Sequence, residues 1–176
     1  MIMTRADAQG AVMDNRSLVG RCGLYCGACG IYRAQRDDQE WRKRIAEHFD
    51  CPAEKVRCDG CGALTPDCWG WDCKLVLCLN NRGHQFCNEC PDYEQHTCEK
   101  FEKLAKRYLE EDGVDLRKNL AMIEEGRVDE WLADSKRLYA CRHCGKPVTT
   151  GAKRCHHCGL EIDLSSGDPA DTDENC

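Results

Sequence analysis

Twelve cysteines lie within residues 22–98, and they constrain the fold of this chain more than any other feature. The stretch opens with Cys22, Cys26 and Cys29 at the spacing C-x3-C-x2-C. Five cysteine pairs in the whole chain are separated by two residues: Cys26/Cys29, Cys58/Cys61, Cys87/Cys90, Cys141/Cys144 and Cys155/Cys158. In a reducing compartment such pairs are typical of metal sites. Disulfides are the secondary interpretation, because the total cysteine content is high.

The cysteines also bear on stability. The hydrophobic fraction of 41% counts all 17 cysteines of the 176-residue chain, so the apolar residues left for a packed core are few. Small domains with little apolar burial usually depend on disulfides, metals or oligomerisation. We therefore expect bound metal to supply much of the folding free energy of residues 22–98.

Charge and hydropathy indicate the class of protein. The formal net charge is −6 before any thiolate is counted, and general nucleic-acid binding requires a basic surface. Residues 1–20 contain no apolar run of the length that a signal peptide needs, and no segment approaches the ~18 apolar residues of a transmembrane helix. We expect a cytoplasmic protein with no membrane contact, and the sequence leaves its oligomeric state open.

Helical periodicity appears in four segments. Residues 31–49 carry Trp41, Ile45 and Phe49 at four-residue spacing, which predicts a single helix before Pro52. Apolar residues recur at helical spacing in three later segments, which predicts amphipathic helices at 99–112, 115–125 and 128–139. The aromatic residues of these helices are interpreted as core packing.

Two cysteine knuckles follow the last predicted helix. Cys141/Cys144 and Cys155/Cys158 are each followed by glycine, with ten residues between the pairs. This pattern predicts a zinc ribbon with a closed tetrahedral site, and its short strands would be residues 146–148 and 160–162. A structural role is preferred over partner recognition, because structural zinc contributes folding free energy outright.

The predicted fold class is a small irregular metal-stabilised module with α-helices (α+β, few short strands), plus a helical segment and a C-terminal zinc-ribbon β-hairpin. The predicted segments are a flexible lead-in, a cysteine-rich metal-binding module, a helical segment, a zinc ribbon and a disordered acidic tail, at residues 1–20, 21–112, 113–140, 141–164 and 165–176.

Fifteen cysteines are predicted metal ligands: Cys22, Cys26, Cys29, Cys58, Cys61, Cys68, Cys73, Cys78, Cys87, Cys90, Cys98, Cys141, Cys144, Cys155 and Cys158. Twelve cysteines in the first module fit three four-ligand sites, although the sequence does not pair them, and Cys51 and Cys176 have no assigned role. His84 and His96 are candidates to replace a cysteine. Zinc is preferred over iron–sulfur on spacing, and both remain open for residues 22–98.

The motifs of the first module resemble a known family. CGLYCGAC at residues 22–29 is followed by Ile31-Tyr32, by CDGC at 58–61, by Cys73 and Cys78, by CNEC at 87–90 and by CEK at 98–100. This pattern, over about residues 20–110, resembles the cysteine-rich prokaryotic family catalogued as domain of unknown function 3795. The resemblance implies a small metal-binding module with no assigned activity. The C-terminal unit is similar to short zinc ribbons appended to many unrelated proteins.

The expected function is that of a multi-zinc-binding scaffold for a protein partner, with RNA as the second choice. The alternative is a small iron–sulfur electron-transfer protein. No Ser/His/Asp set, phosphate loop or carboxylate pair with catalytic spacing is visible, so we expect no enzymatic activity at the metals.

Overall fold

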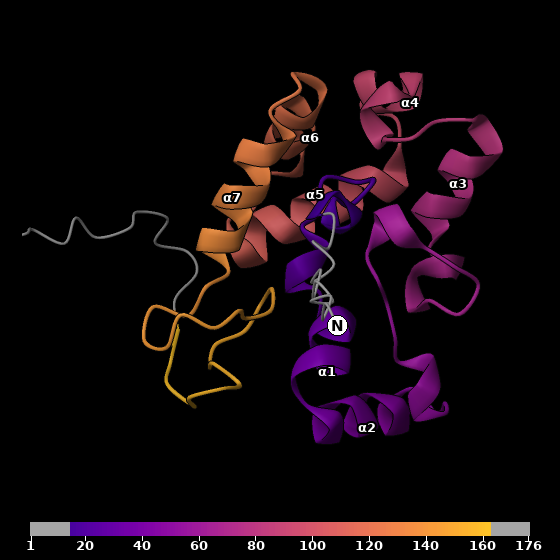
Figure 1. Ribbon diagram of the computed structural model, residues 1–176. Helices are drawn as coiled ribbons and strands as arrows, with labels where there is room; N and C mark the ends of the chain where they lie inside the picture. Colours follow the sequence, from indigo (N-terminus) through magenta and orange to yellow (C-terminus); the bar gives the residue numbers. More distant parts are fainter. Residues whose placement is uncertain (1–14, 163–176) are drawn as a thin grey trace, which may run out of the picture.

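A computed structural model describes residues 15–162 of the chain (Figure 1). Most of the predicted lead-in, the whole predicted acidic tail and Cys176 lie outside the described residues. The described part contains seven α-helices: α1 (Gly30–Asp37), α2 (Gln39–His48), α3 (Lys74–Arg82), α4 (Pro91–Glu94), α5 (Glu99–Asp112), α6 (Leu116–Glu124) and α7 (Val128–Leu138). Short 3-10 helices connect them: η1 (Asn15–Leu18), η2 (Cys26–Ala28), η3 (Ala53–Lys55), η4 (Cys61–Ala63), η5 (Trp69–Asp72) and η6 (Cys87–Glu89).

The prediction of an α+β fold with a C-terminal β-hairpin is wrong. Residues 15–162 form no β-strand and only three isolated antiparallel bridges, Val19↔Tyr25, Ala140↔Pro147 and Arg154↔Glu161. Each predicted strand of the ribbon pairs with the chain just before its own knuckle, and the two do not combine into a hairpin. The first bridge is flanked by hydrogen bonds from the N–H of Cys141 to the Lys146 carbonyl at 2.9 Å and from the N–H of Val148 to the Tyr139 carbonyl at 2.8 Å, so this predicted strand pairs within its own knuckle and not with the other one. The fold of the described residues is therefore mostly helical.

The helix predicted at residues 31–49 is two helices. The chain leaves helical geometry at Asp38, which has φ −155° and ψ 110°. Its side chain accepts hydrogen bonds from the backbone N–H groups of Glu40 and Trp41, at 2.9 and 3.0 Å. Asp38 thus caps the amino terminus of α2, as aspartate does readily, and α1 ends at Asp37.

The three later helices are confirmed, and they build the core. In Figure 1, α6 and α7 lie on one side of α5 and α3 lies on the other. Phe101, Leu116 and Leu120 are 0% exposed and Trp131 is 2% exposed. Gly23 packs closely against α6, since a Cβ atom there would lie 2.7 Å from the Leu116 carbonyl oxygen, and its φ of 85° is also one that favours glycine. The first cysteine loop therefore lies directly on the helical core.

Two helices were not predicted. Helix α3 carries Val76 and Leu79 on its buried face and ends at Gly83 in the left-handed conformation. Helix α4 is a single turn that begins at Pro91, the position at which proline is well tolerated. Both are short segments between cysteines, where the metal-ligand spacing obscured the helical pattern.

The segment with the two knuckles, residues 140–162, packs on the rest of the molecule. Val148 is 0% exposed and belongs to the core with Tyr139, whose ring stacks on Tyr25 at a centroid distance of 6.1 Å. The backbone N–H of Thr150 donates to the Ala28 carbonyl oxygen at 3.1 Å. We call this segment the two-knuckle unit, and its position is fixed by contacts with η2, α1 and α5.

Candidate metal centre

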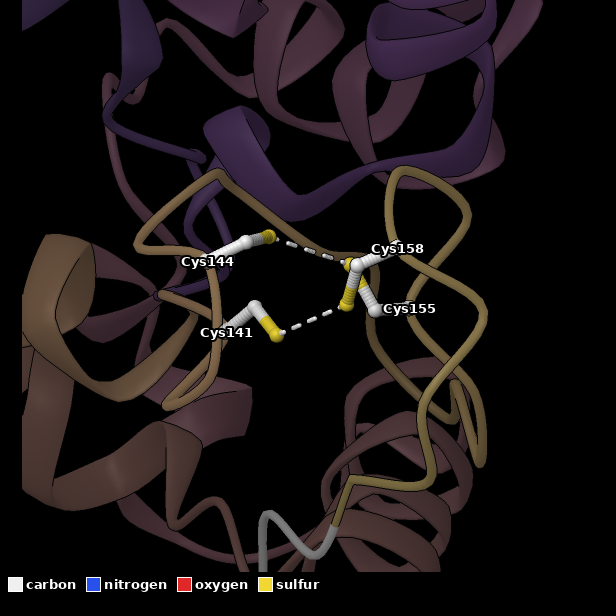
Figure 2. A group of neighbouring side chains, drawn as sticks. All are labelled: Cys141, Cys144, Cys155 and Cys158. Atoms are coloured by element: carbon white, nitrogen blue, oxygen red, sulfur yellow. Dashed lines mark hydrogen bonds between the residues drawn. The ribbon is translucent and has the colours of Figure 1, made fainter.

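The four cysteines of the two-knuckle unit converge. Their Sγ atoms all lie within 4.8 Å of one another, with Cys141 and Cys158 at 3.8 Å and Cys144 and Cys155 at 3.7 Å. Figure 2 shows the four side chains pointing inward from two facing loops. The four cysteines predicted as ligands of this site therefore lie close enough together to hold one metal ion.

Both knuckles are built in the same way. The N–H of Gly145 donates to the Cys141 carbonyl at 2.7 Å, and the N–H of Gly159 donates to the Cys155 carbonyl at 2.8 Å. These two glycines have φ of 68° and 74°, a left-handed conformation that glycine adopts without steric cost. The first cysteine of each pair is buried and the second is exposed. The glycine after each pair is therefore what closes the turn around the sulfurs.

Without a metal, the four thiols cannot all ionise. Burial raises the pKa of Cys141, but the backbone N–H groups of Cys144 and His143 outweigh it, and the pKa falls to about 6. At Cys158 the Leu160 N–H lowers the pKa, yet partial desolvation and the neighbouring thiols raise it to about 11. One thiolate is thus favoured at the expense of the others, and a bound cation is what allows all four to be deprotonated.

The cysteines of the first module fall into neighbourhoods that the sequence could not assign. The N–H of Cys61 donates to Cys26 Sγ at 3.4 Å. The Cys26 thiol donates to Cys61, which lowers the pKa of Cys61 to about 7. Burial raises the pKa of Cys22, and the thiols of Cys61, Cys87 and Cys73 raise it further. Cys22, Cys26 and Cys61 therefore lie near one another, and the thiols of Cys87 and Cys73 are close enough to Cys22 to act on its charge.

A second neighbourhood surrounds Cys58. Burial raises the pKa of Cys58 to about 11, and the nearby thiols of Cys29 and Cys68 add to the effect. Cys68 is 4% exposed, and its sulfur lies 3.5 Å from the Thr65 hydroxyl and 3.9 Å from a carboxylate oxygen of Asp59. This neighbourhood has three cysteines and one nearby carboxylate.

A third neighbourhood surrounds Cys87. Burial raises its pKa to about 12, with further contributions from Cys98, Cys78 and Cys90. Arg82 donates to Cys90 Sγ at 2.9 Å and pairs with Asp92 at 2.7 Å. Sequence reasoning missed Arg82, although its position one helical turn after Cys78 is a usable signal.

The first-module cysteines are less tightly gathered than those of the two-knuckle unit. Among residues 15–162, two groups have all their possible ligand atoms within 4.8 Å: the four cysteines of the two-knuckle unit, and Asp37 with His156 and His157. Metal binding by the other eleven predicted cysteines therefore stays a prediction.

The remaining candidates face other groups. Cys51 lines a surface pocket of about 510 Å³ with Lys43 and Pro52. His84 Nδ1 lies 3.9 Å from a carboxylate oxygen of Glu89, and His96 Nδ1 lies 3.7 Å from one of Glu102.

The second group of possible ligands was not foreseen. Asp37 lies 119 residues before His156 and 120 before His157 in the chain, and nothing in the local sequence connects it with the two histidines. Burial lowers the pKa of His157, and the charge of His156 lowers it further, which favours the neutral imidazole. A neutral imidazole is the form that ligates metals.

Comparison with known proteins bears on the first module. Residues 18–103 match the family described as Protein of unknown function (DUF3795). This confirms the resemblance drawn from the cysteine motifs. The DUF3795 match ends before the two-knuckle unit begins. No curated protein and no solved structure matches the chain.

No described helix has the length and apolar character required to cross a membrane.

Proposed function

We propose that this protein is a multi-zinc-binding scaffold whose metals stabilise a surface for binding another protein. The observation that carries the proposal is the convergence of four thiols in the two-knuckle unit. Four protein ligands leave no open position, which is the arrangement of structural zinc. The role assigned to this metal is therefore structural.

The sulfur spacing supports a single ion at that site. Zn–S bonds of about 2.3 Å in a tetrahedron separate the sulfurs by about 3.8 Å. Two of the Sγ–Sγ distances are 3.8 Å, between Cys141 and Cys158, and 3.7 Å, between Cys144 and Cys155. A [4Fe–4S] cluster binds each cysteine to a different iron, and a [2Fe–2S] cluster places its two cysteine pairs on different irons, so both separate the four sulfurs more widely as a set. The spacing thus favours one tetrahedral ion here.

We extend the proposal to the first module, with one metal in each of the three cysteine neighbourhoods. Its buried thiols occupy positions at which a small domain would otherwise need apolar side chains. Zinc binding there would release protons and add folding free energy.

An iron–sulfur electron-transfer protein is the second candidate, and one observation favours it. Arg82 donates to Cys90 Sγ at 2.9 Å, and hydrogen bonds to ligand sulfurs are one means by which proteins tune the potentials of iron–sulfur clusters. This candidate applies to the Cys78, Cys87, Cys90 and Cys98 neighbourhood.

A protein partner is supported by charge and by exposed aromatic side chains. The net charge of −6 disfavours RNA as partner. Phe49 is 54% exposed and packs edge-on against Trp69, and Trp71 is 39% exposed. Aromatic residues are enriched at protein interfaces. The test is purification of the wild type and of the double variant Phe49→Ser/Trp71→Ser from native cells. A protein that co-purifies with the wild type and is lost from the double variant supports a protein partner. Equal retention of that protein by both contradicts it.

Elemental analysis tests the metal assignment. Protein purified without oxygen should contain zinc and no acid-labile sulfide. Iron with stoichiometric sulfide and a brown colour would replace the proposal by the electron-transfer candidate. Absence of any tightly bound metal would contradict both.

A further inference from the structure

Asp37, His156 and His157 form a compact group beside the four-cysteine site. His156 Nε2 lies 3.1 Å from Asp37 Oδ2, and His157 Nε2 lies 3.6 Å from the same oxygen. The ring centroids of the two histidines are 4.0 Å apart. The side chains are only 12%, 19% and 16% exposed, in the order Asp37, His156, His157. Three potential ligands thus face one another in a largely water-excluded position.

These separations match those of a metal site. Metal–nitrogen and metal–oxygen bonds of about 2.0–2.1 Å place tetrahedral ligand atoms about 3.3–3.4 Å apart. The distances of 3.1 and 3.6 Å lie on either side of that value. Two imidazoles and a carboxylate are also the ligand types that zinc and related divalent ions accept.

The protein holds the group in place from two directions. Asp37 is the last residue of α1, while both histidines lie between Cys155 and Cys158 in the second knuckle. The Trp41 ring packs against His156 at a centroid distance of 5.0 Å. His157 Nε2 is buried and makes no hydrogen bond, because Asp37 Oδ2 at 3.6 Å is too distant for one. A buried nitrogen without a partner is costly unless something binds it.

We propose that Asp37, His156 and His157 bind a divalent transition metal of the zinc type. With three protein ligands the site keeps a coordination position for water or another small ligand, unlike the closed four-cysteine site. This inference rests on the proposed function in one respect: the four-cysteine metal is what folds the second knuckle and presents the two histidines.

Arg33 sets the strength of the site. Its Nη1 lies 3.6 Å from Asp37 Oδ2, one helical turn away, and its Nε is buried without a partner. The guanidinium neutralises Asp37 in the metal-free protein and repels an incoming cation. The site is therefore weaker than the thiolate sites, and removal of this charge strengthens it.

Cobalt separates the two kinds of site. The full chain is loaded with zinc, stripped of weakly bound metal with a mild chelator, and titrated with Co²⁺. Zinc stays in the thiolate sites because they bind it more tightly than cobalt. Wild type should take up one equivalent of Co²⁺ with visible absorption and no sulfur-to-cobalt charge-transfer band. Asp37→Asn and His157→Gln should each weaken this binding at least tenfold.

The control is His143→Gln, which changes an exposed histidine at the corresponding position of the first knuckle. It should bind Co²⁺ as wild type does. Arg33→Gln should bind Co²⁺ more tightly, an outcome that misfolding cannot mimic. Absence of cobalt uptake by zinc-loaded wild type, or equal effects of His157→Gln and His143→Gln, would overturn the proposal. If the four-cysteine proposal were wrong, the failure would appear before the Co²⁺ titration, because the chelator-treated protein would retain no tightly bound zinc.

Discussion

Gly151 donates a 2.6 Å hydrogen bond from its backbone N–H to Oδ1 of Asp112. Asp112 is the last residue of α5 and is only 7% exposed. The bond connects the two-knuckle unit to the helical core across 39 residues of chain. A buried carboxylate needs such a donor, so the bond serves both partners.

Asp112→Ala should lower the free energy of unfolding by about 1–3 kcal/mol, because a charge-assisted bond is lost in a partly buried position. Urea unfolding at a fixed zinc concentration measures this. Glu111→Ala is the control: Glu111 is exposed and 3.9 Å from Arg107, so its removal should cost less than about 1 kcal/mol. Equal effects of the two variants would contradict a role for the Asp112 bond.

Gly23→Ala should destabilise the protein more than Gly83→Ala. Both glycines have positive φ, at 85° and 72°, so both alanines cost roughly 1 kcal/mol in backbone strain. At Gly23 the added methyl also meets the Leu116 carbonyl oxygen at 2.7 Å, whereas nothing lies within 4 Å at Gly83. The extra destabilisation should be about 1–3 kcal/mol. Thermal or urea unfolding measures the stability of both variants. If their free energies of unfolding agreed within error, the close packing of Gly23 on α6 would be refuted.

Cys155→Ser should remove one tightly bound zinc ion per chain and unfold the second knuckle, since Cys155 is 1% exposed and contacts Cys144 at 3.7 Å. Zinc content after chelator treatment is the measurement. Cys51→Ser provides the control, because Cys51 lines an open surface pocket. Loss of zinc from the Cys51 variant, or its retention by the Cys155 variant, would show that the ligands are assigned wrongly.

Chelation should abolish the cooperative thermal transition of residues 22–98. Several of its core positions are occupied by cysteines, so metal binding and folding are coupled there. Calorimetry with and without a strong chelator measures this. A sharp transition in the metal-free protein would mean that apolar packing alone holds the module together.

Local patterns in the sequence predicted local structure well. The helix at residues 99–112 matches α5 at both ends, because a clear apolar stripe is followed by Gly113 as a left-handed stop. The four-cysteine site was equally predictable, since each knuckle is a short loop closed by its own glycine. The break between α1 and α2 at Asp38 could not be predicted, because an aspartate side chain is compatible both with a charged helix face and with the cap of a new helix.

Long-range relationships were beyond the sequence. The two strands predicted in the two-knuckle unit were expected to form a hairpin, but in the structure each pairs within its own knuckle. Asp37 faces two histidines 119 and 120 residues away, and its own surroundings in the sequence give no sign of that contact. Arg82 gained its role only when α3 placed it next to Cys90. Such contacts depend on tertiary packing, which a single sequence does not reveal.

The most direct test of the central claim is the metal content of the full chain, purified without oxygen and treated with a mild chelator. The account predicts about four zinc ions per chain, no iron and no acid-labile sulfide. It also predicts that one of the ions is lost when Cys155 is replaced by serine. Iron and sulfide in stoichiometric amounts, or protein that is folded and free of metal, would contradict it.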